Sequence, residues 1–368
     1  MKISHITLWK YPLELSEPYS YSGARLTNIP TLIARVETDD GFVGWGESCP
    51  LGPTYQPAHA LGGVAAVRVF APTLIGTDAL PRILSQRMDL ALEGHAYAKA
   101  LIDIAAWDIL GKRAGLPLHQ LLGGALMDKV PSYYAIAPSE PSEARATAKK
   151  YVDQGFRAFQ LKIGSGDLDQ DAASIRAVWE ILPSGVSLAA DANRALLAEE
   201  AIHLSKMVGD IPIAFEQPCN SVEEMRSLKG RLKHPLYWDE STTSPTTVID
   251  ALGQGYCDGL GMKITRVGGI SAILAVRDMA IAKGVKLSVD DSWGGDIIAA
   301  ACTHVGATVP PRLFRGTWLA KPYLTGNYGA DADINILNGF IDLPTKPGLG
   351  IEPDVSIFGD PVFEIGSN

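Results

Sequence analysis

The stretch AFQLKIGSG, residues 158–166, has the composition of a buried strand that ends in a charge. Lys162 stands between Leu161 and Ile163, where a charged group is costly unless it has a partner or a task. Gln160 lies two residues earlier and therefore faces the same side of the strand, because side chains alternate with a period of two. The stretch predicts a strand whose C-terminal end presents polar side chains to a site.

Short apolar runs of the same kind recur along the chain and alternate with helical segments. Eight can be recognised, including this one: VPSYYAI, FRAFQLKI, VSLAADA, IPIAFEQP, PLYWDES, DGLGMKI, VKLSVDD and RLFRGTW. Helical patterns such as SEARATAKKYVDQGF and SAILAVRDMAIAKG separate them. This regular alternation predicts a (β/α) barrel, in which catalytic groups lie at the C-terminal ends of the strands.

The residues before the first of these runs have a different pattern. Residues 1–48 alternate as strands do, and Asp40-Gly41 is a strong hairpin signal. Residues 59–111 have a helical pattern that ends in a long apolar helix, and Gly115 lies just past its expected end. The front of the chain therefore predicts a small α+β domain.

A chain of 368 residues suits one large domain and a smaller one. We expect an α+β capping domain over residues 1–125 and a barrel over residues 126–319. The tail, residues 320–368, is rich in Gly and Pro and is expected to pack back on the capping domain.

The composition excludes several classes of protein. The net charge is −9 with no block of like charges, which argues against nucleic-acid binding. The four cysteines have no CxxC spacing, so neither a disulfide framework nor a thiolate zinc site is indicated. No signal peptide and no apolar run of about 18 residues is present, so we expect a cytoplasmic protein that does not enter the membrane.

Three carboxylates end three consecutive predicted strands: Asp191, Glu216 and Asp239. They would meet at the mouth of the barrel, where bare carboxylates repel one another strongly. A divalent cation would relieve this repulsion, and ligands that are all oxygen favour Mg²⁺. The alternative is that each carboxylate caps the helix that follows it.

Two lysines, Lys162 and Lys263, end the second and sixth strands, on opposite sides of the expected mouth. A free lysine has a pKa of about 10.4, but burial and a neighbouring cation would lower that pKa enough for it to act as a base. Two such lysines could exchange a proton with either face of a bound carbon. The alternative is a structural salt bridge between each lysine and a nearby carboxylate.

These residues carry a resemblance to a known family. AKALIDIAAWDILGKRAGLPLHQLLGG resembles the segment that joins cap to barrel in the enolase superfamily, and LKIG, ADANR, FEQP, DES and MKITRVGG follow in the order of its muconate-lactonizing-enzyme subgroup. The resemblance implies an α/β fold, a (β/α)7β modified TIM barrel with an N-terminal α+β cap, and an essential Mg²⁺. It also implies roles for the residues above: metal ligands at Asp191, Glu216 and Asp239, and acid/base lysines at Lys162 and Lys263.

The chain departs from the subgroup at one position. The subgroup usually shows Lys-x-Lys at the end of the second strand, whereas this chain has Gln160-Leu161-Lys162. Loss of the first lysine should make Lys162 more basic, unless the substrate brings a cation of its own. We interpret Gln160 as reducing repulsion in a site that holds an ammonium.

The ends of the last two strands indicate the kind of substrate. SVDDSWGGD supplies Asp290, Asp291 and Trp293, and FRGTWLAKPY supplies Trp318. Acidic groups and aromatic faces are how proteins hold an ammonium. The capping-domain loops add Tyr19, Tyr21 and Tyr55 as walls over a small ring. The alternatives are that the tryptophans pack barrel against cap, and that the aspartates cap a helix or pair with Lys263.

This pattern is most similar to the proline-analogue branch, the cis-3-hydroxy-L-proline dehydratases and hydroxyproline-betaine 2-epimerases. We expect a dehydratase that removes the C2 proton and the 3-hydroxyl to give Δ1-pyrroline-2-carboxylate, with competing 2-epimerisation. A betaine epimerase, an N-acylamino-acid or dipeptide racemase and a non-catalytic descendant remain alternatives. The expected partner is a small cyclic amino acid or betaine, and a homo-oligomer is expected by analogy.

Overall fold

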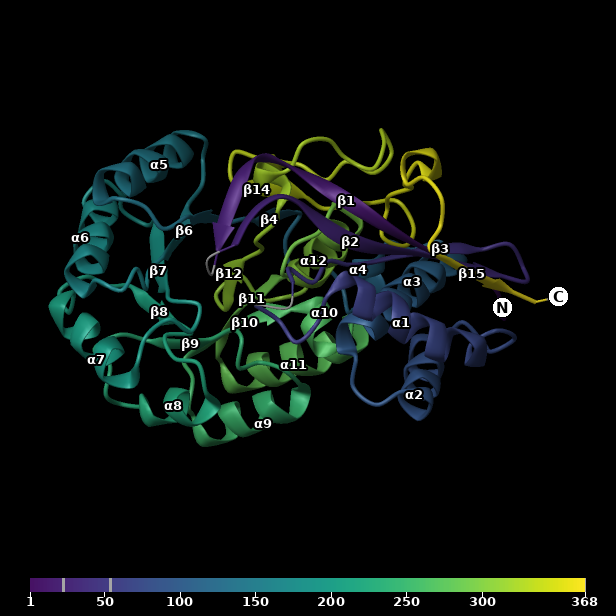
Figure 1. Ribbon diagram of the computed structural model, residues 1–368, viewed down its shortest axis with the longest axis horizontal. Coiled ribbons are helices and arrows are strands. Elements are labelled where there is room, and N and C mark those ends of the chain that lie inside the picture. The colour runs from purple at the N-terminus through teal and green to yellow at the C-terminus, as the bar shows by residue number, and fades with distance from the viewer. Residues whose placement is uncertain (22–23, 53–54, 368) are drawn as a thin grey trace.

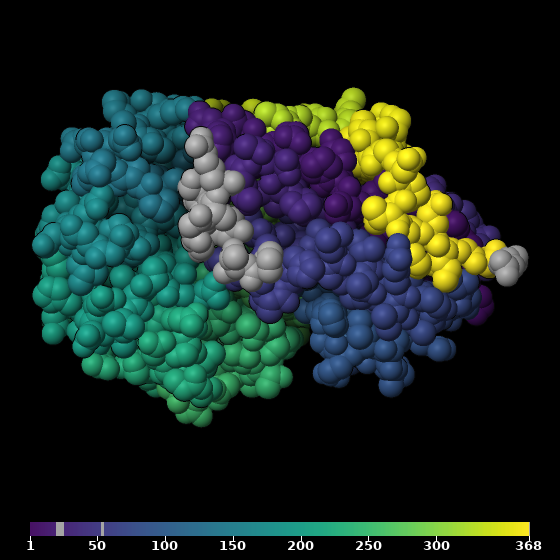
Figure 2. All heavy atoms as spheres, viewed as in Figure 1, coloured from purple at the N-terminus to yellow at the C-terminus, as the bar shows by residue number. Residues whose placement is uncertain are grey.

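The computed structural model describes residues 1–21, 24–52 and 55–367. A ring of strands and helices, coloured teal to green, lies beside a second body built from the purple, blue and yellow segments (Figure 1). Both chain ends lie at the far end of this second body (Figure 1). In the space-filling view, the teal and green surface of the first body adjoins the purple and blue surface of the second (Figure 2).

The first body is a parallel barrel of eight strands, ordered β5 to β12. Its strands are β5 (Tyr134–Ile136), β6 (Ala158–Lys162), β7 (Ser187–Asp191), β8 (Ala214–Glu216), β9 (Leu236–Trp238), β10 (Gly259–Lys263), β11 (Lys286–Asp290) and β12 (Phe314–Gly316). The helices between them are α5 (Pro141–Asp153), α6 (Leu168–Trp179), α7 (Ala198–Met207), α8 (Val222–Ser227), α9 (Pro245–Gln254), α10 (Ile264–Val267), α11 (Ile270–Lys283) and α12 (Asp296–Ala307). Seven strand–helix units, with α10 as an extra turn, precede the last strand, so the predicted (β/α)7β barrel is confirmed.

The ring closes between its first and last strands. Just before β5, Ser132 forms a parallel bridge with Thr317, just after β12. The amide N of Thr317 donates to the carbonyl O of Pro131 at 2.9 Å, and the hydroxyl of Ser132 donates to the carbonyl O of Thr317 at 2.8 Å. Closure brings the ends of all eight strands around one mouth.

Local sequence explains where these elements begin and end. Asp167 caps α6 by accepting from two amide N–H groups, and Ser244 caps α9, whose first residue is Pro245. α9 ends at Gly255 in the left-handed conformation. The barrel strands are buried on both faces and therefore read as continuous apolar runs, as parallel strands do.

The second body is built on an antiparallel sheet ordered β15-β1-β2-β3. The strands are β1 (Ile3–Tyr21), β2 (Ala24–Thr38), β3 (Val43–Ser48) and β15 (Phe363–Gly366), and the helices are α1 (Ala60–Phe70), α2 (Pro81–Ala91), α3 (Ala96–Ala114) and α4 (Leu118–Leu121). The predicted hairpin at Asp40-Gly41 joins β2 to β3, and Gly115 ends α3 with a φ of 67°. The strand nearest the C-terminus, β15, pairs with β1, so the cap sheet contains both ends of the described chain.

Short elements complete the fold. A small sheet ordered β13-β14-β4 joins Ile336–Leu337 and Phe340–Asp342 to Lys129–Pro131, at the start of the barrel. The described residues also form single turns of 3₁₀ helix at Ala71–Thr73, Lys321–Tyr323 and Val355–Ile357. No helix in the described part of the chain is long and apolar enough to cross a membrane. The division of the chain at residues 125 and 319 stays a prediction.

Two buried carboxylates of the cap fasten it to the barrel, and we call Glu47 and Asp103 the clamp carboxylates. Glu47, on β3, accepts from the amide N of Gly295 at 2.7 Å and of Ile298 at 3.1 Å, at the start of α12. Asp103, on α3, accepts from the amide N of Ser271 at 3.0 Å, at the start of α11. Each clamp carboxylate thus caps a barrel helix, and these helices follow the strands that end in Asp290 and Lys263.

Glu47 makes two further contacts that tie other parts of the chain to the same point. The hydroxyl of Thr31 donates to it at 2.9 Å, and the hydroxyl of Tyr328 donates at 2.6 Å. Burial raises the pKa of Glu47 to about 7, although these donors act in the opposite direction. Burial likewise raises the pKa of Asp103 to about 6.

Candidate active site

Six polar residues lie at the C-terminal ends of consecutive barrel strands. Five are the last residues of their strands, and Asp239 directly follows β9: Lys162, Asp191, Glu216, Asp239, Lys263 and Asp290. Register keeps these ends level, since Lys162 is paired with Asp191 and Asp191 with Glu216. Gln160, two residues before Lys162, is buried and turned to the same interior. The polar strand ends therefore meet at one mouth.

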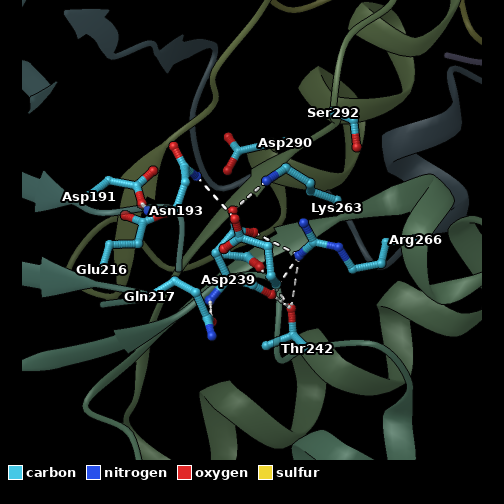
Figure 3. Close-up of polar contacts among 12 residues, drawn as sticks. Asp191, Asn193, Glu216, Gln217, Asp239, Thr242, Lys263, Arg266, Asp290 and Ser292 are labelled. Carbon is cyan, nitrogen blue, oxygen red and sulfur yellow. Dashed lines mark hydrogen bonds and ion pairs between the residues drawn. The ribbon is translucent and has the colours of Figure 1, made fainter. Parts of the chain in front are cut away.

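We call Asp191, Glu216 and Asp239 the mouth carboxylates, and a cation accompanies each of them. The Nζ of Lys162 lies 2.5 Å from Asp191, and the Nζ of Lys263 lies 2.5 Å from Asp239. The cation beside Glu216 is an arginine, and a second arginine accompanies Asp239; both are described below. Figure 3 shows Lys263 and Asp239 directed toward each other, with Glu216 at the end of the adjacent β8 and Asp191 at the end of β7.

Two arginines and the glutamine complete this compensation. Arg266 donates to Asp239 at 2.7 Å, and Arg315 donates to Glu216 at 3.0 Å while lying over the ring of Tyr237. The amide Nε2 of Gln160 donates to the other oxygen of Glu216 at 3.0 Å. Gln160 therefore orients a mouth carboxylate without adding a charge beside Lys162.

The pKa values differ between the two sides of the mouth. Burial raises the pKa of Asp191 to about 7, and the Lys162 ammonium opposes this shift. Burial would also raise the pKa of Asp239, but the charges of Arg266 and Lys263 hold it below its ordinary value. Burial alone would lower the pKa of Lys162, yet the Asp191 carboxylate raises it above the usual range. In this arrangement Lys162 is a cation rather than a base.

The donor set of the mouth fits a hard divalent cation. All three mouth carboxylates offer oxygen, the ligand that Mg²⁺ prefers. A Cβ placed on Gly261, in β10, would lie 3.2 Å from Oδ1 of Asp239 and 3.2 Å from Oε1 of Glu216. These two oxygens thus flank one small space that the glycine leaves open. As they stand, however, the described residues contain no group of three or more His, Cys, Asp or Glu side chains close enough to hold a metal ion.

A cavity of about 260 Å³ opens above these residues. It is lined by the site residues predicted from the sequence, apart from Asp191 and from Tyr21, whose side chain lies outside the described part of the structure: Tyr19, Tyr55, Gln160, Lys162, Glu216, Asp239, Lys263, Asp290, Asp291, Trp293 and Trp318. Asp191 is fully buried behind Lys162. The cavity lies at the junction of cap and barrel, since Tyr19 and Tyr55 come from the cap. Its volume suits a small ligand.

Aromatic rings form one wall of this cavity. The ring centroid of Trp293 lies 5.1 Å from that of Tyr19 and 5.4 Å from that of Trp318, both edge to face. Tyr323, from the tail, lies 5.8 Å from Trp318. Trp293 and Trp318 therefore have both of the roles that the sequence left open. They pack the cap and the tail against the barrel, and they line the cavity.

The two adjacent aspartates have different surroundings. Asp291 accepts from the amide N of Thr265 at 2.9 Å and from its hydroxyl at 2.7 Å, so both of its oxygens hold the turn after β10. Asp290 accepts from the hydroxyl of Tyr133 at 3.0 Å and from the amide N of Trp318 at 2.6 Å. Burial raises the pKa of Asp290 to about 7. The hydroxyl of Ser288 also donates to Asp290, so both oxygens of each aspartate are engaged, but two partners of Asp290, Tyr133 and Trp318, line the cavity themselves.

Several residues of the site were not singled out from the sequence. They are Tyr133, Asn193, Glu240, Arg266, Arg315 and Tyr323. Arg315 had a usable signal, because it stands in the last barrel strand among apolar residues, as the lysines do in theirs. Glu240 and Arg266 lie within the DES and MKITRVGG motifs. A motif alone does not show which of its side chains meet those of other loops in the folded protein, so these two were not selected.

Comparison with known proteins agrees with this geometry. Residues 5–123 match the family described as "Mandelate racemase / muconate lactonizing enzyme, N-terminal domain", and residues 143–357 match "Enolase C-terminal domain-like". The chain is 37% identical to a cis-3-hydroxy-L-proline dehydratase of Roseibium aggregatum, over 98% of this chain and 99% of that one. It is 28% identical to an L-Ala-D/L-Glu epimerase of Bacillus subtilis, over 95% and 97%.

Solved structures give the same result. An enolase-superfamily member from Roseovarius nubinhibens complexed with magnesium has a TM-score of 0.94, with 33% identity over 100% of both chains. A muconate lactonizing enzyme from Pseudomonas fluorescens complexed with muconolactone has a TM-score of 0.90, with 27% identity over 97% of this chain and 98% of that one. This chain is therefore an enzyme of the enolase superfamily, in the group of the mandelate racemases and muconate lactonizing enzymes.

Proposed function

We propose that this enzyme removes the proton α to the carboxylate of cis-3-hydroxy-L-proline and eliminates water, with Mg²⁺ as cofactor. The C2–H bond breaks first and leaves its electron pair on the substrate. The C3–O bond then breaks, and the leaving hydroxide takes a proton to become water. The enamine that remains tautomerises to Δ1-pyrroline-2-carboxylate. Atoms and electrons balance without any oxidant or reductant.

Lys162 and Lys263 carry the proton transfers in this proposal. They stand on the second and sixth strands of the ring, so a substrate between them presents one face to each. One lysine takes the C2 proton, and the other can return a proton to the opposite face, which gives the competing 2-epimer. Each lysine must first leave its carboxylate, 2.5 Å away, to act as a base.

Asp191, Glu216 and Asp239 would hold the magnesium ion. When bound, the ion would make the C2–H more acidic and offset the negative charge that develops on the substrate carboxylate. A cation at the mouth carboxylates would also replace the lysines as their counter-charge, which frees both amines. Gln160 would keep Glu216 oriented during this exchange.

The cyclic amine would lie against Asp290, Trp293 and Trp318. A secondary ammonium can donate to a carboxylate and lie on an aromatic face at once. Asp290 is buried and accepts only from neutral donors among the contacts described above, so a cationic ligand would offset its charge. This pairing of a buried acid with an aromatic wall, in a cavity that both lysines also line, is the observation that carries the choice of substrate.

Proton NMR in D₂O tests this proposal. The purified protein with Mg²⁺ and cis-3-hydroxy-L-proline should lose the C2 signal and form the pyrroline product. Exchange of the C2 proton without elimination would instead indicate an epimerase, and the betaines of proline and 4-hydroxyproline would be tried next. No exchange at all would exclude the proline-analogue reading, and larger N-acylamino acids and dipeptides would then be tested.

The betaine epimerase is the second candidate. A quaternary nitrogen needs aromatic faces and gains nothing from a hydrogen-bond acceptor, and the wall formed by Tyr19, Trp293 and Trp318 could supply such faces. Asp290 favours the secondary amine, because a buried acceptor is best satisfied by an N–H donor. Homo-oligomeric assembly and a cytoplasmic location stay predictions.

A further inference from the structure

Arg315 is the cation that accompanies Glu216 at the mouth, where Asp191 and Asp239 have lysines. It stands in the middle of β12, on the opposite side of the ring from β8, which ends in Glu216. The Nη2 of Arg315 donates to Oε2 of Glu216 at 3.0 Å, and the Nε2 of Gln160 donates to Oε1 at 3.0 Å. Each oxygen of this carboxylate therefore has its own donor, which fixes its orientation as well as its position.

The oxygen that Arg315 holds differs from the oxygen that borders the space left by Gly261. A Cβ placed on Gly261 would lie 3.2 Å from Oε1 of Glu216 and 3.2 Å from Oδ1 of Asp239, so these two oxygens flank that space. Arg315 bonds to the other oxygen of Glu216, Oε2. A cation could therefore bind Oε1 while Arg315 stays in place, because a carboxylate oxygen accepts more than one partner.

The ring of Tyr237 fixes the guanidinium of Arg315 from another direction. The Cζ of Arg315 lies 4.2 Å from the centroid of this ring, within the range of a cation–π contact. Tyr237 stands in β9 opposite Gly259 in β10, and a Cβ placed on Gly259 would lie 2.3 Å from Cδ1 of Tyr237. The missing side chain of Gly259 therefore leaves the space that the ring occupies.

Short side chains leave part of the barrel interior open beside Arg315. A cavity of about 550 Å³ lies at the N-terminal ends of the strands, and its lining includes Arg315, Tyr237, Ala189 and Ala214. Alanines do not fill a barrel layer as bulky branched residues usually do, so close packing does not hold Arg315 where it lines this cavity. Its position there depends on the bond to Glu216 and on the contact with the Tyr237 ring.

We propose that Arg315 is a positioning residue for Glu216 and that, through this carboxylate, it makes the site select Mg²⁺ over the larger Ca²⁺. Mg²⁺ needs ligands at about 2.1 Å in nearly ideal octahedral geometry, whereas Ca²⁺ accepts longer and more variable contacts. A carboxylate held at both oxygens cannot move aside for a larger ion without losing a donor. The inference rests on the magnesium site of the proposed function, but it does not depend on which substrate the enzyme uses.

Titration calorimetry of the intact protein with Mg²⁺ and with Ca²⁺ tests this inference. Arg315→Lys keeps the positive charge but loses the planar group that can donate to Glu216 and lie over Tyr237 at once. It should weaken Mg²⁺ binding about tenfold, or ~1.4 kcal/mol, and change Ca²⁺ binding by less than about threefold. The ratio of the two affinities is the readout, because a general loss of structure would weaken the binding of both ions alike.

Two variants of Tyr237 test the ring without altering Arg315. Tyr237→Leu removes the ring and should lower the same ratio about threefold, which keeps the inference testable if Arg315→Lys does not fold. Tyr237→Phe is the matched control, since it keeps the ring and should leave both affinities within about twofold.

The outcomes distinguish this inference from the proposed function. Equal losses for both ions in Arg315→Lys, or an unchanged ratio in Tyr237→Leu, would overturn the role of Arg315. No binding of Mg²⁺ to the wild type would overturn the magnesium site together with this role. Absence of turnover in the NMR experiment would overturn the choice of substrate and leave a measured ion selectivity standing.

Discussion

The mouth carboxylates and the clamp carboxylates are equally buried but are compensated in opposite ways. Asp191 and Asp239 are 0% and 2% exposed, and Glu47 and Asp103 are 0% and 1% exposed. Lysines and arginines neutralise the mouth carboxylates. Among the described residues, the clamp carboxylates accept from amide N–H and hydroxyl groups alone, at the starts of helices and from neighbouring strands and loops.

This difference in partners implies that the mouth carboxylates can exchange their counter-charges, whereas the clamp carboxylates cannot exchange their donors. A lysine on a flexible stem can leave a carboxylate when another cation arrives. The amide groups at a helix start have fixed positions, and removing their acceptor leaves them unsatisfied. Substitutions at the mouth should therefore act on catalysis, and substitutions at the clamp should act on stability.

The largest effect should come from the mouth lysines. Lys162→Ala and Lys263→Ala should each reduce turnover of cis-3-hydroxy-L-proline by about 10²–10⁴-fold, because each removes a proton-transfer group. Deuterium exchange at C2, followed by NMR, measures this loss, and circular dichroism checks the fold. The exposed Lys286→Ala serves as the control. Full exchange in both mouth variants would show that these lysines are structural ion-pair partners only.

At the clamp, Glu47→Ala should lower the free energy of unfolding by roughly 3 kcal/mol or more, because it leaves four buried donors without an acceptor. Chemical denaturation gives this value. Glu364→Ala is the matched control, since that side chain is 54% exposed and should change stability by less than about 0.5 kcal/mol. Equal stability of the two variants would remove the contrast between mouth and clamp.

The contribution of Asp103, the other clamp carboxylate, can be tested at Gly269, because the missing side chain of this glycine leaves space for the carboxylate. Gly269 has a φ of +118°, and a Cβ there would lie 2.3 Å from Oδ2 of Asp103. Gly269→Ala should therefore cost about 2–3 kcal/mol of stability, from backbone strain and displacement of the carboxylate. Gly284→Ala, at a φ of +68° with no atom within 4 Å of its Cβ, should cost about 1 kcal/mol. Equal losses of stability in the two variants would mean that the Asp103 side chain can move away from the added methyl group at no cost in free energy.

The pH dependence of stability should sharpen the same contrast. The folded-state pKa of Glu47, about 7, exceeds its ordinary value of 4.5, so the folded protein holds a proton that the unfolded chain has released. The contribution of Glu47 to stability should therefore fall as pH rises from 4.5 to about 7, by at most about 1.4 kcal/mol per pH unit. Denaturation of the wild type and of Glu47→Gln at several pH values isolates this slope. Identical slopes would contradict it.

The smallest expected effect concerns the space between two mouth carboxylates. Gly261→Ala would place a methyl group 3.2 Å from an oxygen of Asp239 and of Glu216, so these side chains must move slightly apart. We expect Mg²⁺ affinity to fall about tenfold, or ~1.4 kcal/mol, while the melting temperature changes little. Titration calorimetry with Mg²⁺ measures the affinity. Unchanged affinity would show that the ion does not need this geometry.

Local patterns were enough to predict the barrel and the polar groups at its mouth. Lys162, Asp191 and Glu216 could be located because side-chain alternation and parallel register are regular features of neighbouring strands. The contacts of Glu47 with α12 could not, since they join residues 248 and 251 positions apart. The different surroundings of Asp290 and Asp291 were also beyond reach, because adjacent residues face opposite sides and only the structure shows what lies there.

The pairing of β1 with β15 has a consequence for the order in which the molecule is made. Residues 5–8 pair with residues 363–366, so β1 is synthesised long before the strand that pairs with its edge. The barrel strands can pair while synthesis continues, but this edge of the cap sheet stays open until β15 has emerged. Since the cap supplies Tyr19 and Tyr55 to the active-site cavity, a nascent chain lacks the finished cap that supports them. The cap sheet is thus incomplete until residues 363–366 have left the ribosome.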